Sequence, residues 1–248
     1  MSNQNRTFSG GLIDRNKTIN FIFNGKKYKG FQGDTLASAL LANDVHLVGR
    51  SFKYHRPRGI LTAGSEEPNA LIQLGIGART EPNIRATEIE LYEGLEAESQ
   101  NCWPSVDFDI GEANNLLSRL FPAGFYYKTF KWPPSLWLFY EHFIRKAAGL
   151  GESPKAKNPD RYEQRFHYCD VMIVGGGVSG LTAALAAARA KCDVLLVDEN
   201  PYFGGYLSDS SASINGKNIG DWIRIVLDEL KSYENVKLLK RTSAMGYY

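Results

Sequence analysis

The stretch Val171-Met-Ile-Val-Gly-Gly-Gly-Val-Ser-Gly180 decides the fold of the second part of this 248-residue sequence. It contains Gly175, Gly177 and Gly180 in the order G-x-G-x-x-G. Apolar residues before these glycines predict a strand, and small residues after them predict a helix. A glycine-rich turn in that position is typical of a dinucleotide-binding site.

The flanking segments complete a βαβ unit. Residues 170–174 and 193–197 predict strands, and the alanine-rich segment 179–190 predicts the helix between them. The second strand ends at Asp198, 23 residues after Gly175 (198 − 175), which is close to the ~20 residues expected for this motif. We therefore predict a bound dinucleotide. The alternative is a doubly wound sheet with no ligand at its switch point.

Each residue type in the turn suits one part of a dinucleotide. Gly175 permits the sharp turn, Gly177 lets the backbone approach the pyrophosphate, and Gly180 lets the helix pack close to the sheet. The helix begins near Ser179, so its free N–H groups and its dipole face the phosphates. We expect these four residues to surround the pyrophosphate.

The adenosine half is expected to lie beyond the second strand. Asp198 and Glu199 are predicted to accept hydrogen bonds from the ribose hydroxyls, and an acid there favours NAD or FAD because it would repel a 2′-phosphate. Asn200 and Tyr206 belong to a loop that can close over the adenosine. Ala244 follows the third predicted strand, whose end usually meets the adenine edge in this fold.

The first hundred residues predict a different and smaller fold. Residues 1–16 are interpreted as an N-terminal arm and residues 17–100 as a small α+β domain. Residues 18–23 alternate as a strand, and Asn24-Gly25 predicts a tight hairpin that returns over residues 26–31.

A helix and further strands complete this predicted domain. Asp34 or Thr35 is expected to cap a helix that ends at about Ala42. Strands are expected at residues 69–74 and 84–91. This set of elements indicates a small domain of β-grasp type.

The remaining sequence divides into a linker and the dinucleotide-binding domain. Residues 101–165 form an aromatic-rich segment with a helix at about 135–148, and we interpret its aromatic residues as packing between domains, with a subunit interface as the alternative. Residues 166–248 form the α/β domain, of Rossmann-like type. Its later elements are an amphipathic helix at 219–231 and a third strand at 236–239. So few strands indicate an incomplete domain.

Composition excludes several classes of protein. The 29 basic and 27 acidic residues give a net charge of +2, which provides no general case for nucleic-acid binding. No apolar run is long enough to span a membrane, and no secretory signal is expected. The basic, aromatic-interleaved run Arg50–Arg58 resembles a single-strand binding loop, but we favour a solvated loop, or arginines paired with acids such as Glu66 and Glu67.

Cysteine usage points to a reduced compartment. Cys102, Cys169 and Cys192 are an odd and widely spaced set, so they predict neither a disulfide framework nor a metal cluster. A cytoplasmic location fits best, and no metal site is expected.

Several blocks of sequence resemble the α subunit of heterotetrameric sarcosine oxidase. They are Gly33–Ala42, Gly49–Gly59, Glu67–Leu71, Ser99–Pro104 and Gly124–Phe130, together with the glycine-rich βαβ unit. The Gly49–Gly59 block, Gly-Arg-Ser-Phe-Lys-Tyr-His-Arg-Pro-Arg-Gly, is long and unusual, so the resemblance is specific.

This resemblance implies a cytoplasmic flavoprotein complex that oxidises sarcosine to glycine. Its other products are hydrogen peroxide and a one-carbon unit that tetrahydrofolate accepts. In that family NAD is held by the α subunit, FAD and sarcosine by the β subunit, and FMN at the αβ interface. The partners implied are the remaining α sequence and the β, γ and δ subunits.

The family's α subunit is several times longer than this chain, so the chain corresponds to its N-terminal quarter. We expect it to hold part of the NAD site and no catalytic residue. Alone, it should bind NAD weakly, self-associate and oxidise no sarcosine. The alternatives are the α subunit of another amine or opine dehydrogenase, and a non-catalytic dinucleotide-binding scaffold.

The N-terminal domain also resembles β-grasp ferredoxin-like domains that hold a 2Fe–2S cluster. Such a cluster needs four ligands, usually cysteine thiolates. There is no cysteine between residues 17 and 100. We therefore expect no iron–sulfur cluster.

Overall fold

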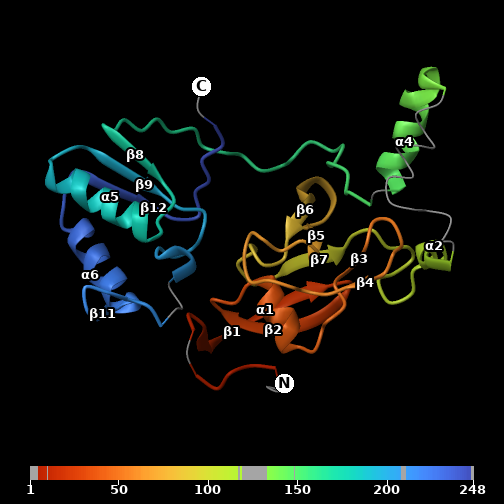
Figure 1. The fold of residues 1–248 in the computed structure, drawn as a ribbon, viewed down its shortest axis with the longest axis horizontal. Coiled ribbons are helices and arrows are strands. Elements are labelled where there is room, and N and C mark those ends of the chain that lie inside the picture. The colour runs from red at the N-terminus through yellow and green to blue at the C-terminus, as the bar shows by residue number, and fades with distance from the viewer. Residues whose placement is uncertain are drawn as a thin grey trace. The chain divides into compact units, whose positions relative to one another are not determined.

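The fold is described by a computed structural model. It describes residues 5–9, 11–116, 118, 133–147, 149–207 and 211–246. The Gly124–Phe130 block and the aromatic residues between 119 and 132 lie outside these ranges. The chain divides into two compact units, Met1–Asp160 and Arg161–Tyr248, which are treated separately (Figure 1).

The first unit is built on a mixed five-stranded sheet in the order β2-β1-β7-β5-β6. The outer pairs are antiparallel, whereas the central pair, β1 with β7, is parallel. Its strands are β1 (Asp14–Phe23), β2 (Lys26–Gln32), β5 (Leu71–Leu74), β6 (Glu81–Arg85) and β7 (Leu95–Ser99).

The predicted hairpin is confirmed. Strands β1 and β2 pair antiparallel up to Phe23 opposite Lys26, which leaves a two-residue turn. Asn24 and Gly25 both have positive φ, 49° and 72°. A type I′ turn needs positive φ at both central positions, and Asn-Gly adopts this conformation readily.

Helix α1 (Leu36–Ala42) has the predicted position, and Thr35 rather than Asp34 is its N-cap. Thr35 Oγ1 accepts a hydrogen bond from Ser38 N, and Ser38 Oγ accepts one from Thr35 N, at 3.1 and 3.0 Å. This reciprocal pair satisfies two backbone donors at the start of the helix. The Asp34 carboxylate instead binds Arg6 of the N-terminal arm.

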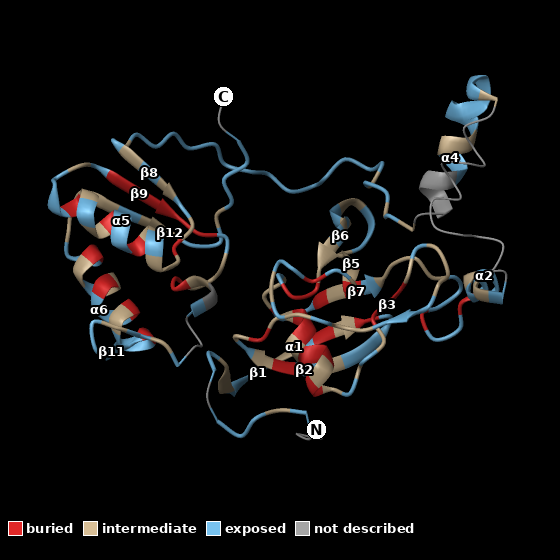
Figure 2. Cartoon of the chain, viewed as in Figure 1, coloured by how far each residue is buried: buried red, intermediate tan, exposed pale blue. Residues whose placement is uncertain are grey.

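The core of the first unit lies between this helix and the sheet. Figure 2 shows α1 buried along most of its length. Apolar side chains from the helix and the strands form one cluster, which includes Phe21, Phe23, Leu36, Leu40, Val48, Ile72, Leu91 and Leu95. Burial of each such side chain stabilises the fold by about 1.5–3 kcal/mol.

The strand predicted at 84–91 is wrong beyond Arg85. Residues after β6 instead bond the beginning of α1: Ile89 O accepts from Leu36 N at 2.8 Å, and Ala86 O accepts from Ala37 N at 2.9 Å. The first N–H groups of a helix have no partner within it, so this segment satisfies them. No strand was predicted at the position of β7, which is the central strand of the sheet.

Two arginines of the basic run are held by other groups than Glu66 and Glu67. Arg50 is buried; its Nε donates to Val106 O at 2.8 Å and its Nη1 to a Glu112 carboxylate oxygen at 3.0 Å. Arg56 donates to Asn115 at 2.9 Å. The predicted pairing with Glu67 is wrong, because that carboxylate binds backbone N–H groups.

Further elements occur in other described parts of the first unit. Residues Pro134–Leu136 and Trp137–Ala147 form η4 and α4, where one helix was predicted. Among the described residues, no helix is long and apolar enough to cross a membrane. The other short elements are β3 (Gly49–Arg50), β4 (Pro57–Arg58), η1 (Gly77–Arg79), η2 (Ile110–Glu112) and α2 (Ala113–Leu116).

The second unit contains a parallel three-stranded sheet in the order β12-β9-β8. The predicted βαβ unit is confirmed, with each element within about one residue of its expected bounds. The elements of the second unit are β8 (Val171–Val174), α5 (Val178–Arg189), β9 (Val194–Val197), η5 (Gly205–Leu207), β10 (Ser213–Ile214), β11 (Lys217–Asn218), α6 (Ile219–Lys231) and β12 (Val236–Leu239).

Helices α5 and α6 share one apolar core with this sheet. Ile173, Leu196 and Leu238 lie side by side in register across the three strands. Leu181 of α5 and Ile223 of α6 belong to the same cluster. Because the strands are parallel, their carboxyl ends meet at one edge, where the glycine-rich turn begins.

Candidate dinucleotide-binding site

The glycine-rich turn joins β8 to the start of α5, which is partly exposed. Gly175 has φ +92°, in the left-handed region that favours glycine. Gly177 is the N-cap of α5, and no side chain caps the helix there. The first N–H groups of α5 therefore remain available to an anion, which the helix dipole also favours.

Gly177 and Gly180 differ in their surroundings. A methyl group added at Gly180 would lie 1.9 Å from the carbonyl oxygen of Gly175, so only glycine fits there without movement of the backbone. A methyl group added at Gly177 would meet no atom within 4 Å. The space beside Gly177 is open, as a site for an approaching pyrophosphate requires.

Asp198 joins this turn to the end of β9. The residue is 5% exposed, and its Oδ2 accepts a hydrogen bond from Gly176 N at 2.6 Å. Its Oδ1 accepts from the backbone N and the side-chain amide of Asn200, at 2.8 and 3.0 Å. Both carboxylate oxygens thus bind protein groups, while the neighbouring Glu199 is exposed.

The loop after β9 packs directly on the glycine-rich turn. Gly204 N donates to Gly176 O at 2.8 Å. The Phe203 ring covers Gly176 so closely that a methyl group added there would lie 2.2 Å from it. Gly176, Phe203 and Gly204 were not identified from the sequence as site residues. The double glycine at 204–205, with φ of +125° and +61°, was the signal that could have identified them.

The structure brings most of the predicted site residues together. Gly175, Gly177, Gly180, Asp198 and Asn200 gather at the carboxyl ends of β8 and β9 through the contacts above. Ser179 is exposed in the first turn of α5, and Ala244 is exposed in the segment after β12. Tyr206 lies in η5, and its side chain is outside the described part of the chain.

An Asp198→Asn variant is expected to loosen the glycine-rich turn. An amide in place of the carboxylate would direct an NH₂ group at an existing donor, either Gly176 N or the Asn200 donors. A buried donor left unsatisfied costs about 1–3 kcal/mol, so the free energy of unfolding should fall by that amount. Urea unfolding would measure it, with Glu199→Gln, at the exposed neighbouring position, as the control. Equal stability of both variants would contradict this role.

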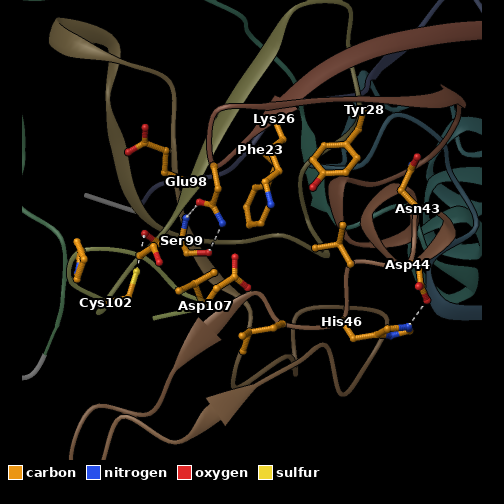
Figure 3. Close-up of a pocket in the computed structure, with 16 residues that line it drawn as sticks. Phe23, Lys26, Tyr28, Asn43, Asp44, His46, Glu98, Ser99, Cys102 and Asp107 are labelled. Carbon is orange, nitrogen blue, oxygen red and sulfur yellow. Dashed lines mark hydrogen bonds and ion pairs between the residues drawn. The ribbon is translucent and has the colours of Figure 1, made fainter. Parts of the chain in front are cut away.

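A separate cleft of about 710 Å³ lies in the first unit (Figure 3). It opens beside the β1–β2 hairpin, and His46 and Asp44 pair at 2.8 Å at its edge. Lys26, Glu98 and Asp107 give its lining charges of both signs. None of the predicted nucleotide-binding residues lines it, because they belong to the second unit.

Cys102 lines the same cleft but is not poised to react. The side chain is partly buried, and its Sγ lies 3.9 Å from Ser99 O. Burial, and then the neighbouring Asp109 carboxylate, raises the pKa of the Cys102 thiol. The thiol is therefore protonated at neutral pH and is a poor nucleophile and metal ligand.

Comparison with known protein families assigns a description to each unit. Residues 16–102 match the family described as a 2Fe-2S iron-sulfur cluster binding domain. Residues 170–241 match the family described as FAD dependent oxidoreductase. The second match spans the glycine-rich turn, Asp198 and the loop that packs on them.

Individual proteins extend the similarity along nearly the whole chain. Sarcosine oxidase subunit alpha of Rhizobium meliloti (strain 1021) is 57% identical over 239 residues, which are 96% of this chain and 24% of that protein. The chain is homologous to part of sarcosine oxidase subunit alpha. The subunit of the same name from Corynebacterium sp. (strain U-96) is 32% identical over 97% of the chain and 20% of its own length. The chain thus spans about a quarter or less of these relatives.

A solved structure has a related fold. The crystal structure of L-proline dehydrogenase from P. horikoshii matches 94% of this chain and 35% of its own chain, with a TM-score of 0.53 and 21% sequence identity. At that identity the likeness concerns the fold alone.

Proposed function

We propose that this chain is part of the α subunit of a sarcosine oxidase and that its second unit binds NAD. The observation that carries the proposal is the 57% identity to a sarcosine oxidase subunit alpha over 96% of the chain. The uncapped start of α5 and the open space at Gly177 supply a place for the pyrophosphate. We further propose a β-grasp fold for the first unit and a Rossmann-like fold for the second.

The choice of NAD rests on the sarcosine oxidase resemblance. NAD and FAD share the ADP group, and the geometry around the glycine-rich turn suits that group in either cofactor. The match to the FAD dependent oxidoreductase family supports a flavin as the other candidate. A bound NAD or FAD supplies hydride-transfer chemistry.

The residues of this chain would bind and orient the nucleotide rather than react with it. The backbone N–H groups that begin α5 would hold the pyrophosphate, with Ser179 beside them. Glu199 is exposed and would bind the ribose, whereas Asp198 keeps the turn in the shape that the phosphates require. Asn200, Tyr206 and Ala244 would bound the adenosine.

The full reaction would need partners beyond this chain. We propose that the rest of an α subunit and β, γ and δ subunits supply the FAD, FMN and folate sites. The complex would oxidise sarcosine to glycine and hydrogen peroxide and pass a one-carbon unit to tetrahydrofolate in the cytoplasm. No catalytic residue is assigned to this chain, and no nucleic-acid or membrane partner is proposed.

Release of the bound nucleotide tests the cofactor. The protein is purified from its native source with its partners, denatured, and the nucleotides are identified by mass spectrometry. In a second step, the native complex is digested with a protease and the fragments that retain a nucleotide are isolated. NAD should be recovered with the fragment that contains this chain's second unit. Recovery of FAD alone from this segment would overturn the NAD assignment.

Peroxide production by the same complex tests the reaction. Sarcosine should give peroxide and glycine, whereas proline and an opine should give much less. A preference for proline or an opine would assign the chain to another dehydrogenase. A complex without sarcosine oxidation and without bound nucleotide would support a non-catalytic scaffold.

A further inference from the structure

Residues 16–102 of the first unit match an iron–sulfur domain family but lack the residues for a cluster. A 2Fe–2S cluster is held by four ligands, usually cysteine thiolates. The matched segment, residues 16–102, contains only Cys102. Within the described ranges, no group of three or more His, Cys, Asp or Glu side chains could hold a metal ion. The residues present therefore do not fit the cluster.

A buried carboxylate lies where several backbone donors converge in this unit. Glu67 is 1% exposed. Its Oε2 accepts hydrogen bonds from Leu61 N and Thr62 N, both at 2.7 Å. Its Oε1 accepts from Asn69 N at 2.7 Å and from Ala70 N at 3.1 Å. Four N–H groups from two short stretches of one loop thus point at a single anion.

The sheet and its neighbouring segment hold this loop in place. Thr87 Oγ1 donates to Gly64 O at 2.8 Å, and Ala86 N donates to Ala70 O at 2.9 Å. Arg85 Nε donates to Glu67 O, the backbone oxygen, at 3.1 Å. The position of the N–H groups is therefore fixed by hydrogen bonds to the rest of the domain, and not by the Glu67 side chain alone.

Concavities of this kind bind anions. Successive backbone N–H groups that converge in a turn form the anion sites of many phosphate-binding and iron–sulfur proteins. A cluster with thiolate ligands carries negative charge, and hydrogen bonds to its sulfur atoms stabilise that charge. A carboxylate supplied by the loop can meet the same donors.

We propose that the Glu67 carboxylate is an internal anion that fills and organises the loop 61–70 in place of an iron–sulfur cluster. The loop keeps its folded shape without metal, and the unit serves as a scaffold with no electron-transfer centre. A second consequence is that removal of the side chain exposes a binding site for a small carboxylate such as formate.

The ionised form of Glu67 is the one that the loop holds. Burial by itself would raise the pKa of the Glu67 carboxyl, but the backbone hydrogen bonds from Thr62, Asn69, Leu61 and Ala70 outweigh burial and lower it. The carboxylate therefore contributes stability above its unfolded pKa, and that stability is lost as the pH falls through the folded pKa. The other charged groups of the loop and of the adjoining residues 81–91 are Glu66, Glu81, Arg85, Glu88 and Glu90.

Chemical rescue of a Glu67→Ala variant of the 248-residue chain tests the proposal. Four unpaired donors should lower the melting temperature of the first unit by roughly 10 °C. Sodium formate should restore part of this loss in Glu67→Ala and have no such effect on the wild type. Sodium chloride at equal ionic strength controls for salt, and Glu66→Gln, at the exposed neighbouring position, controls for loss of charge.

A second variant covers the case in which Glu67→Ala does not fold. Glu67→Gln keeps the shape of the side chain but places an NH₂ group against N–H donors. Hydrogen exchange at the amides of Leu61, Thr62, Asn69 and Ala70 should accelerate at least tenfold in this variant and stay unchanged in Glu66→Gln.

Two results would overturn the proposal. One is unchanged exchange at these four amides in Glu67→Gln. The other is stoichiometric iron and sulfide in wild-type protein purified and reconstituted without air. Both measurements are independent of nucleotide binding, so failure of the NAD proposal would leave them unaffected.

Discussion

A Gly177→Val variant is expected to fold like the wild type and to bind dinucleotide on the order of 100-fold more weakly, a loss of about 2.8 kcal/mol. The protein tolerates the change because Gly177 has an ordinary φ of −69° and open space beside its Cα. The nucleotide does not, because the added side chain would occupy the space through which the pyrophosphate approaches the backbone.

Isothermal titration of the full α subunit, carrying Gly177→Val or the wild-type residue, with NAD and with FAD measures this loss. Gly220→Val is the matched control, because it makes the same change in the first turn of α6, where the nearest atom to an added methyl group is 3.4 Å away. Equal affinity of Gly177→Val and the wild type would place the nucleotide elsewhere. Unfolding of Gly177→Val would contradict the open space seen in the structure.

A Gly180→Ala variant should, unlike Gly177→Val, lower the stability of the fold itself. Its added methyl group would lie 1.9 Å from the backbone oxygen of Gly175, so the start of α5 must move away from β8. Overpacking of this kind costs about 1–3 kcal/mol, and occasionally more, when the backbone has to shift. Within a helix, alanine is otherwise about 1 kcal/mol more favourable than glycine, so the sign of the effect is diagnostic.

Urea unfolding of the second unit, monitored by the hydrogen exchange of its backbone amides, measures this effect. Gly177→Ala adds the same methyl group into open space and serves as the control. A Gly180→Ala protein as stable as that control, or more stable, would show that α5 and β8 do not approach as closely as described.

Local sequence signals were sufficient to predict most of the second unit. Short apolar runs bounded by glycine and by an acid gave β8 and β9 almost to the residue, because strand and turn preferences act over a few neighbouring positions. The role of Asp198 could not be predicted in the same way. Its bond to Gly176 joins residues 22 positions apart, and it forms only when two loops meet.

Less of the first unit could be predicted from its sequence. Asn24-Gly25 determined the hairpin, since that pair favours one turn type. A strand was predicted at 84–91, but no pattern in the sequence indicates that the backbone oxygens of Ala86 and Ile89 would instead accept hydrogen bonds from the start of α1. Glu67 was named, with Glu66, as an example of an acid that could pair with the arginines if the basic run was not simply a solvated loop. A charged residue in a sequence gives no sign of whether backbone N–H groups surround it.

The parallel pairing of β1 with β7 has a consequence for synthesis on the ribosome. Phe21 lies opposite Leu95, so the centre of this sheet joins segments more than seventy positions apart. The β1–β2 hairpin emerges first, and the apolar side chains of β1 stay without their partner until β7 leaves the ribosome. Contacts so distant in sequence slow folding. Nascent chains that end before β7 should therefore remain protease-sensitive and depend on chaperones, and resistance should appear in one step once β7 is released.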